Sequence, residues 1–468
     1  MTQPYPKHPQ LDGNYAPLRM ECDIDDVVIR GELPRELAGT YYRNGPDPQY
    51  PPLGEHHWFA GDGMVHAWHV EDGRVRYRNR WPRTRKWQHE RAAKRALWSP
   101  FDPRMNDPSV AGVSLDGLAN TNIVWHAGKL LALEEAHSPF ALDPATLDSQ
   151  GPWTFGGAYE GPMTAHPKMD PESGEMLFFG YNASGPFSTG MTYQVVDAAG
   201  KLTRSERFDA PYSSMVHDFI TTDEHVIFPI FPLTGSLSRA MQGRPPFAWE
   251  PELGTRIGVM PRSGSTRDIR WFETDPCYVF HPMNAFTDGT RIVAHVMQFE
   301  EAPLFPHADG TPPDRKKSRA RLAEWVIDLG DNSRGVARRY LDDIVGEFPR
   351  LDERRTGLAY RHGYYAASSR DGDAIGFDAI VHHDFRRGTK RLYQFEPGDG
   401  VGEPVFVPRS PTAPEGEGYL VAVVYRGREN RSDLAFFDAT SVEAGPIALA
   451  ELPHRVPYGF HGNWRAAQ

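Results

Sequence analysis

Four histidines, His166, His217, His281 and His461, constrain the fold of this chain more than any other feature. Each lies in a short segment that combines strand-like residues with a turn: TAHPK, MVHDF, VFHPMNAF and GFHGNW. They are separated by 51, 64 and 180 residues, so no single helix or hairpin can hold all four. If their side chains converge, they do so at the axis of a large radial fold.

An imidazole set without cysteine suits a borderline divalent metal such as Fe(II), Zn(II), Cu(II) or Ni(II). The alternative is an ordinary one. The chain has 19 histidines, and a histidine taken singly more often serves as a core or surface residue than as a ligand. Four ligands that close a tetrahedron would make a structural zinc site, whereas four ligands on an octahedron leave two positions open. The sequence does not distinguish these two geometries.

Short segments of strand composition recur along the chain, and turn signals separate them. The run GRVRYRNRW (73–81) alternates apolar and polar residues, as half-buried strands do. Further strands are expected at 226–233, 291–299, 419–427 and 433–439. Glycine-containing turns are expected at 71–74, 126–129, 287–290 and 415–418. Because no clean repeat of fixed length is present, this pattern alone predicts an all-β fold, either a sandwich or a propeller.

Helical segments are few, and we expect short helices at KWQHERAAKRALW (86–98) and LTGSLSRAMQG (233–243). No linker or shift in composition marks a boundary, so residues 1–468 are predicted to form a single domain. A chain of 468 residues is long for one domain. A propeller accommodates this length because it adds blades around an axis instead of enlarging one core.

Charge and cysteine usage exclude some classes of function. The formal net charge is −11, from 62 acidic and 51 basic residues, whereas a protein that binds nucleic acid needs a basic footprint. Cys22 and Cys277 are expected to be reduced thiols. The N-terminus lacks an apolar signal segment, and no stretch of about 18 apolar residues occurs. We therefore expect a cytoplasmic protein, and leave open its oligomeric state and weak peripheral contact with a membrane.

Several long motifs occur in a fixed order, and with them the chain resembles a known family. They are GELPRELAGTYYRNGPDPQ (31–49), HWFAGDGMVHA (57–67), ANTNIVWHAGKLLALEEAHSPFALDP (119–144) and LPHRVPYGFHGNW (452–464). The family is that of the carotenoid cleavage oxygenases, which includes enzymes that cleave lignostilbene and isoeugenol. The resemblance implies a seven-bladed β-propeller, with a dome of loops and short helices over the metal-bearing face. It also implies one Fe(II) bound by His166, His217, His281 and His461.

The resemblance further implies three glutamates that hydrogen-bond the ligand histidines. By motif they are Glu135, Glu347 and Glu403. A ligand histidine usually donates its other N–H to a carboxylate or carbonyl, which fixes the tautomer and the orientation of the ring. A glutamate is more often a solvated surface residue, but these three lie beside apolar residues with a proline soon after. The histidine without such a glutamate is expected to be His166.

Other positions are candidates for the oxygen and substrate site. Thr121 matches a position near the open coordination site of several relatives, where its methyl group could exclude water, although strand propensity explains a threonine equally well. Phe59, Phe101 and Phe280 lie in or beside the motifs and could line an apolar tunnel. Aromatic residues fill protein cores by default, so ordinary core packing is the alternative.

One departure from the family bears on the substrate. Relatives that cleave phenolic alkenes carry a lysine and a tyrosine that hold the phenol. The corresponding positions here are Glu134 and Phe101, which can neither pair with a phenolate nor hydrogen-bond to one. This favours a carotenoid or apocarotenoid substrate. Against it, segments 248–264 and 429–434 are closer to the phenylpropenoid branch, so cleavage of stilbenes or phenylpropenoids to aromatic aldehydes stays open.

The predicted function is a non-heme Fe(II) dioxygenase that splits a C=C bond of an apolar alkene with O2, giving two carbonyl products. No side chain is required as nucleophile or general base, so no catalytic residue of that kind is assigned. The protein supplies metal geometry, a dry cavity and substrate orientation. Two alternatives remain: an isomerase or hydrolase on the same iron scaffold, and a non-catalytic propeller that serves as an interaction platform.

Overall fold

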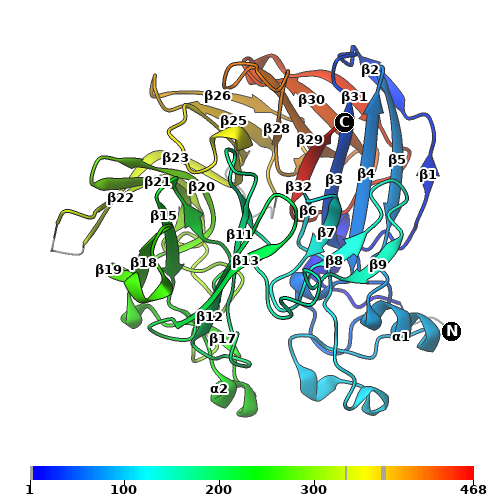
Figure 1. The fold of residues 1–468 in the computed structure, drawn as a ribbon. Coiled ribbons are helices and arrows are strands. Elements are labelled where there is room, and N and C mark those ends of the chain that lie inside the picture. The colour runs from blue at the N-terminus through cyan, green and yellow to red at the C-terminus, as the bar shows by residue number, and fades with distance from the viewer. Residues whose placement is uncertain (1–3, 332–334, 370–375, 468) are drawn as a thin grey trace. The chain divides into compact units, whose positions relative to one another are not determined.

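The computed structural model describes residues 4–331, 335–369 and 376–467, whose regular secondary structure is mostly strand (Figure 1). Contacts divide the chain into two compact units. The first comprises Met1–Glu160, Phe395–Ala413 and Glu417–Gln468, and the second comprises Gly161–Gln394 and Pro414–Gly416. Each unit is described by itself, and the single domain over residues 1–468 stays a prediction.

The first unit contains three antiparallel sheets. One is ordered β1 (Asp23–Ile24), β5 (Arg74–Arg80), β4 (Gly63–Glu71), β3 (Gly39–Pro46) and β32 (Gly462–Ala466). Another is ordered β2 (Val28–Gly31), β31 (Pro446–Glu451), β30 (Arg431–Asp438), β29 (Gly418–Arg426) and β27 (Gly400–Val401), and β28 (Val405–Pro408) also pairs with β29. The third is ordered β6 (Asn122–His126), β7 (Lys129–Leu133), β8 (Phe140–Leu142) and β9 (Ser149–Pro152).

Strands from both ends of the chain share two of these sheets. In one sheet β3 pairs with β32, so that Tyr42 faces Asn463 across the ladder. In the other, β2 pairs with β31, with Val28 opposite Glu451. The first unit is therefore held together by backbone hydrogen bonds between its N-terminal and C-terminal segments.

The β4–β5 hairpin shows why the local pattern predicts the strands well. Asp72 and Gly73 both have positive φ, 55° and 74°, which is the requirement of the tight turn that matches strand twist. In β5 buried and more exposed residues alternate along the strand, as the sequence predicts. Trp68 of β4 is fully buried in the core of this unit, with Tyr41 and Tyr77 around it.

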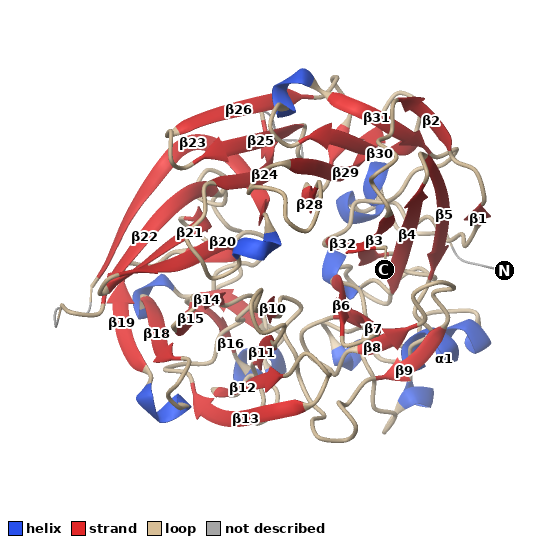
Figure 2. Ribbon diagram, turned by 45° about the horizontal axis from the view of Figure 1, so that its top comes forward, coloured by secondary structure: helices blue, strands red, loops and turns tan. Residues whose placement is uncertain are grey.

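The second unit contains four antiparallel sheets (Figure 2). One four-stranded sheet contains β10 (Lys168–Met169), β11 (Met176–Gly180), β12 (Gly190–Val196) and β13 (Leu202–Asp209). Another four-stranded sheet contains β14 (Ile220–Thr221), β15 (His225–Ile230), β18 (Thr255–Pro261) and β19 (Arg270–Thr274). A two-stranded sheet pairs β16 (Leu233–Gly235) with β17 (Phe247–Trp249). The largest runs through β20 (Tyr278–Asp288), β21 (Arg291–Phe299), β22 (Arg321–Asp328), β23 (Val336–Leu351), β24 (His362–Ser368), β25 (Ala379–Asp384) and β26 (Thr389–Gln394).

Most of the predicted strands and turns are present, within a residue or two of their expected bounds. The exception is 226–233, where β15 ends at Ile230 and Leu233 begins a different strand. Pro232, which has no N–H to donate to a sheet, lies between the two strands. The two segments are separate strands in separate sheets, so the prediction of one continuous strand is wrong.

The two predicted helices are shorter than expected. The first, α1, spans Arg85–Ala93 and ends at Lys94, which adopts the left-handed conformation (φ 56°). The second, α2, spans Leu237–Met241 and begins after the capping hydroxyl of Ser236. Residues 233–235 form a strand instead, because Leu233 pairs with Trp249. The dome that these helices were expected to join stays a prediction. Among the described residues, neither helix has the length and apolar character needed to cross a membrane.

Candidate metal centre

Three of the predicted ligands converge within the second unit. The Nε2 atom of His217 lies 3.0 Å from Nε2 of His166 and 3.1 Å from Nε2 of His281. His166 and His217 lie on irregular segments that precede β10 and β14, and His281 lies within β20. All three rings are buried, so the sequence separations of 51 and 64 residues are closed by the fold, as predicted.

The spacing of these nitrogens fits a shared metal ion. Two nitrogens bound to one metal with bonds of about 2.1 Å lie about 3.0 Å apart at a right angle and about 3.4 Å apart at a tetrahedral angle. The observed 3.0 and 3.1 Å are of the size that a shared metal ion requires. A cation between the rings would be held by nitrogens that lie in a buried space.

His281 and its carboxylate partner both lie at irregularities in the seven-stranded sheet. The register of β20 shifts between Val279 and Pro282, and that of β23 shifts between Glu347 and Arg350. Such bulges re-aim side chains that a regular strand would direct elsewhere. Here they bring Glu347 Oε2 to 2.5 Å from Nδ1 of His281, where the carboxylate accepts a hydrogen bond from Nδ1–H and Nε2 points to the other histidines.

Phe348 was not identified from the sequence, yet it belongs to this site. Its ring stacks on His281 with centroids 5.5 Å apart, and its backbone has a φ of 55°. That left-handed conformation costs about 1 kcal/mol or more for a residue other than glycine and is concentrated at functional sites. The N–H of Phe348 donates to Glu347 Oε2, so the strained backbone also helps to hold the carboxylate.

His461 lies in the first unit with a glutamate of its own. Nδ1 of His461 is 2.9 Å from Glu403 Oε1, and the other carboxylate oxygen accepts from the N–H of Gly462 at 2.9 Å. Both side chains are buried. The His461 backbone N–H donates to the carbonyl of Thr121, which places this predicted oxygen-site residue beside the histidine. The Thr121 hydroxyl donates to the Asn120 side chain.

The four histidines are all buried, three in the second unit and one in the first, and each offers an imidazole nitrogen that could bind a metal ion. Of the three predicted glutamates, Glu347 and Glu403 each contact a histidine. Glu135 is half-buried just after β7, and its assignment to a histidine stays a prediction.

The predicted apolar residues lie close to these histidines in their own units. Phe280 is buried and packs edge-on against His217, with ring centroids 5.1 Å apart. In the first unit, Phe59 packs edge-on against Phe460, which precedes His461, at 5.4 Å. Phe280 thus contacts one of the imidazoles, and Phe59 contacts the residue that precedes another.

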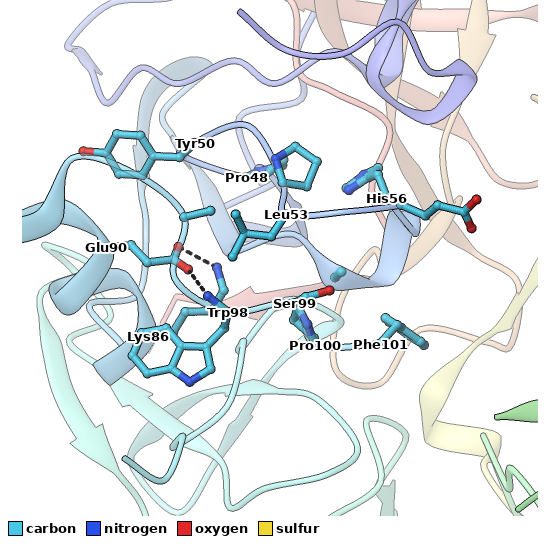
Figure 3. A pocket seen from close by; sticks show the side chains of 14 residues that line it. Pro48, Tyr50, Leu53, His56, Lys86, Glu90, Trp98, Ser99, Pro100 and Phe101 are labelled. Atoms are coloured by element: carbon cyan, nitrogen blue, oxygen red, sulfur yellow. Dashed lines mark hydrogen bonds and ion pairs between the residues drawn. The ribbon is translucent and has the colours of Figure 1, made fainter. Parts of the chain in front are cut away.

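Phe101 contributes to a pocket in the first unit (Figure 3). Its ring lies 4.6 Å from that of His57. One wall of the pocket carries a buried ion pair between Lys86 and Glu90, 2.9 Å apart, and Lys86 also binds Asp62 at 2.8 Å. Figure 3 shows this pair on the side away from Phe101. Burial works against the charge on Lys86, but the two carboxylates outweigh it and raise the pKa of the ammonium.

Glu134 has a partner that sequence reasoning missed. Its Oε1 atom forms a short hydrogen bond with Nδ1 of His137, and the side chains are 13% and 33% exposed. The two residues are three positions apart in a turn after β7. The sequence shows no helical periodicity there that would have predicted their contact.

Comparison with known proteins decides the family. The model of the retinal pigment epithelial membrane protein family matches residues 15–466. The chain belongs to the carotenoid cleavage oxygenase family. Isoeugenol monooxygenase of Pseudomonas nitroreducens shares 40% sequence identity with this chain. The match covers 97% of this chain and 98% of the isoeugenol monooxygenase.

Solved structures of carotenoid cleavage oxygenases agree. Lignostilbene dioxygenase of Pseudomonas brassicacearum has a TM-score of 0.95 and 35% identity, with all of both chains covered. The cobalt-substituted Synechocystis apocarotenoid oxygenase has a TM-score of 0.86 and 28% identity over 96% of this chain and 97% of its own. The predicted all-β fold of the seven-bladed propeller class is confirmed, and the protein is an alkene-cleaving dioxygenase.

Proposed function

We propose that this protein uses Fe(II) and O2 to cleave the C=C bond of an aryl alkene of the stilbene or phenylpropenoid class. One alkene and one O2 give two carbonyl compounds, so no further reductant is needed. The substrate class is supported by the 40% and 35% identities to an isoeugenol monooxygenase and a lignostilbene dioxygenase. The observation that carries the chemistry is the convergence of three buried imidazole Nε2 atoms.

In this proposal the metal is held by His166, His217, His281 and His461. Bound ferrous iron would supply the activation of O2 that a carbon–carbon double bond does not undergo by itself. All four donors are imidazoles, which suit iron among the borderline metals. A solved relative that carries cobalt supports a divalent metal in this family.

The protein's own residues orient and dry the site. Glu347 and Glu403 accept the Nδ1 protons of His281 and His461, which directs each Nε2 lone pair to the metal position. Phe280 and Phe348 cover ring faces and edges of the histidines, so the imidazoles lie in apolar surroundings. We assign Thr121 and Phe59 to the same task around His461, and Glu135 as the carboxylate of a further ligand histidine.

Cleavage of a carotenoid or apocarotenoid is the second candidate. It is favoured by Glu134 and Phe101, which replace the lysine and tyrosine of the phenol-cleaving relatives. Phe101 offers no hydroxyl to a phenol, and its ring lies against that of His57. In either case the partners are an apolar alkene and O2. The cytoplasmic location likewise stays a prediction.

The test is anaerobic purification, loading with Fe(II), and incubation with O2 and a panel of stilbenes, 4-vinylphenols, isoeugenol and apocarotenals. We expect two carbonyl products per O2 consumed, identified by mass spectrometry, with aryl alkenes turned over faster than apocarotenals. Preferred cleavage of apocarotenals would select the second candidate. Rearranged or hydrolysed products without O2 uptake would contradict the oxygenase.

A further inference from the structure

The two segments that carry His166 and His217 are not held by regular sheet pairing. Residues 161–167 and 213–219 are irregular, and each leads into a two-residue strand at the edge of its sheet, β10 or β14. Yet the two Nε2 atoms lie only 3.0 Å apart. Interactions other than a strand ladder must therefore set the relative position of these histidines.

The hydroxyl of Thr164 is the first such interaction. It accepts a hydrogen bond from the backbone N–H of His166 at 3.0 Å and donates one to the backbone carbonyl of His217 at 3.2 Å. Thr164 is completely buried. One side chain thus joins the backbones of both histidines.

An ion pair makes the second connection between the same segments. Lys168 Nζ lies 2.7 Å from Asp218 Oδ1, and that oxygen also accepts from the N–H of Phe219 at 2.7 Å. The Asp218 side chain is only 3% exposed and that of Lys168 is 19% exposed. The other carboxylate oxygen, Oδ2, faces Nδ1 of His166 at 3.9 Å.

This distance distinguishes Asp218 from the two glutamates. Glu347 and Glu403 lie 2.5 and 2.9 Å from their histidines and accept a hydrogen bond directly. A separation of 3.9 Å is too long for a hydrogen bond, so Asp218 acts on His166 through its charge. Lys168 offsets part of that charge and fixes the direction of the carboxylate.

We propose that Lys168 and Asp218 form a positioning pair for His166, the ligand to which family resemblance assigns no glutamate. Asp218 favours the tautomer of His166 that carries its proton on Nδ1 and presents Nε2 to the metal. Lys168 holds Asp218 in place and limits its charge. This inference rests on the proposed metal site. It adds Lys168 and Asp218 to that site as residues that position His166.

Two substitutions separate this role from simple packing. Asp218→Asn removes the charge that faces His166, and loss of a carboxylate partner typically lowers metal affinity about 10-fold or more. Lys168→Met leaves Asp218 unpaired, which destabilises the metal-free protein but exposes His166 to the full carboxylate charge. We therefore expect weaker metal binding in the first variant, and unchanged or tighter metal binding in the second despite a lower Tm.

The readouts are the affinity for Co(II) by competition with a chelator, the visible absorption spectrum of the Co(II) protein, and the Tm of the metal-free protein. Lys201→Met, at an exposed position of the same unit, controls for the loss of a positive charge. If Asp218→Asn does not fold, the double variant Lys168→Met with Asp218→Asn carries the test, because it removes both charges. We expect it to bind Co(II) as weakly as Asp218→Asn.

Three outcomes would overturn the inference. If a variant without the Asp218 charge keeps the Co(II) affinity and the absorption spectrum of the wild type, His166 does not depend on that charge. Affinities that fall in parallel with Tm in both single variants would show a structural role only. The variant His166→Ala distinguishes a failure of this inference from a failure of the metal site itself. Wild-type Co(II) binding in that variant would show that His166 is not a ligand.

Discussion

Glu134 and His137 form a hydrogen-bonded pair, so the carboxylate at this position is not a lone charge. Burial works against protonation of His137, but the charge and the hydrogen bond of Glu134 outweigh it and raise the pKa of the imidazole. The carboxylate of Glu134 therefore counts less against a phenolate substrate than it would without a partner. An aryl alkene with a free phenol becomes compatible with this chain.

The first prediction concerns discrimination between phenols and their methyl ethers. His137→Gln leaves the Glu134 charge uncompensated and should lower kcat/KM for a 4-hydroxystilbene relative to its methyl ether. Glu134→Gln removes the charge and should raise the same ratio. A partly exposed charge of this kind contributes about 0.2–1 kcal/mol, so we expect changes of about 1.4- to 5-fold. An unchanged ratio in both variants would mean that Glu134 does not line the substrate site.

The second prediction concerns the ligands. His217→Ala and His281→Ala should each abolish iron retention and alkene cleavage, since each removes a donor from the cluster of three Nε2 atoms. The circular dichroism spectrum should persist, because packed strands stabilise the fold. His225→Ala, in the same unit but outside the cluster, is the control and should retain iron. Iron content by mass spectrometry decides, and normal iron with normal turnover in either variant would contradict the assignment.

The third prediction concerns the glutamates. Glu347→Gln and Glu403→Gln keep the side-chain volume but weaken the hydrogen bond to His281 or His461. Such a loss typically costs about 10–100-fold in metal affinity or activity. We expect defects of that size that excess iron partly restores, and the same for Glu135→Gln. The exposed Glu172→Gln should behave as wild type. Wild-type iron affinity in all three variants would contradict these roles.

The fourth prediction concerns stability against pH. Burial, with the nearby His362 as the next cause, lowers the pKa of His382 to about 4. Between pH 6.5 and 4 the unfolded chain binds a proton at His382 that the folded protein does not, so stability should decrease as the pH falls through this window. The contribution is at most about 3.4 kcal/mol, from a difference of roughly 2.5 pKa units at 1.36 kcal/mol each.

Urea unfolding at several pH values between 4 and 7.5 measures this effect. His382→Gln should show a flatter dependence of the unfolding free energy on pH than wild type. His89→Gln, at an exposed position on α1, should leave the dependence unchanged. Identical slopes for wild type and His382→Gln would show that His382 is not the group responsible.

The strands were predictable because residues close together in the sequence determine them. Alternation in 73–81 and the Asp72–Gly73 turn determine the β4–β5 hairpin by themselves. The histidines and glutamates were found through motifs, not through geometry. The bulges that aim His281 and Glu347 were not predictable, since a bulge depends on the register of two strands far apart in sequence. For the same reason the sequence did not show that Asp218 faces His166.

The pairing of β2 with β31 and of β3 with β32 has a consequence for biosynthesis. The second unit is almost one continuous stretch, so the ribosome delivers Gly161–Gln394 before the last part of the first unit, from Phe395 onward, exists. His461 follows His281 by 180 residues. A nascent polypeptide thus carries three of the four imidazoles of the proposed site well before the fourth is translated. In that proposal, the fourth ligand becomes available only after the whole second unit has been translated.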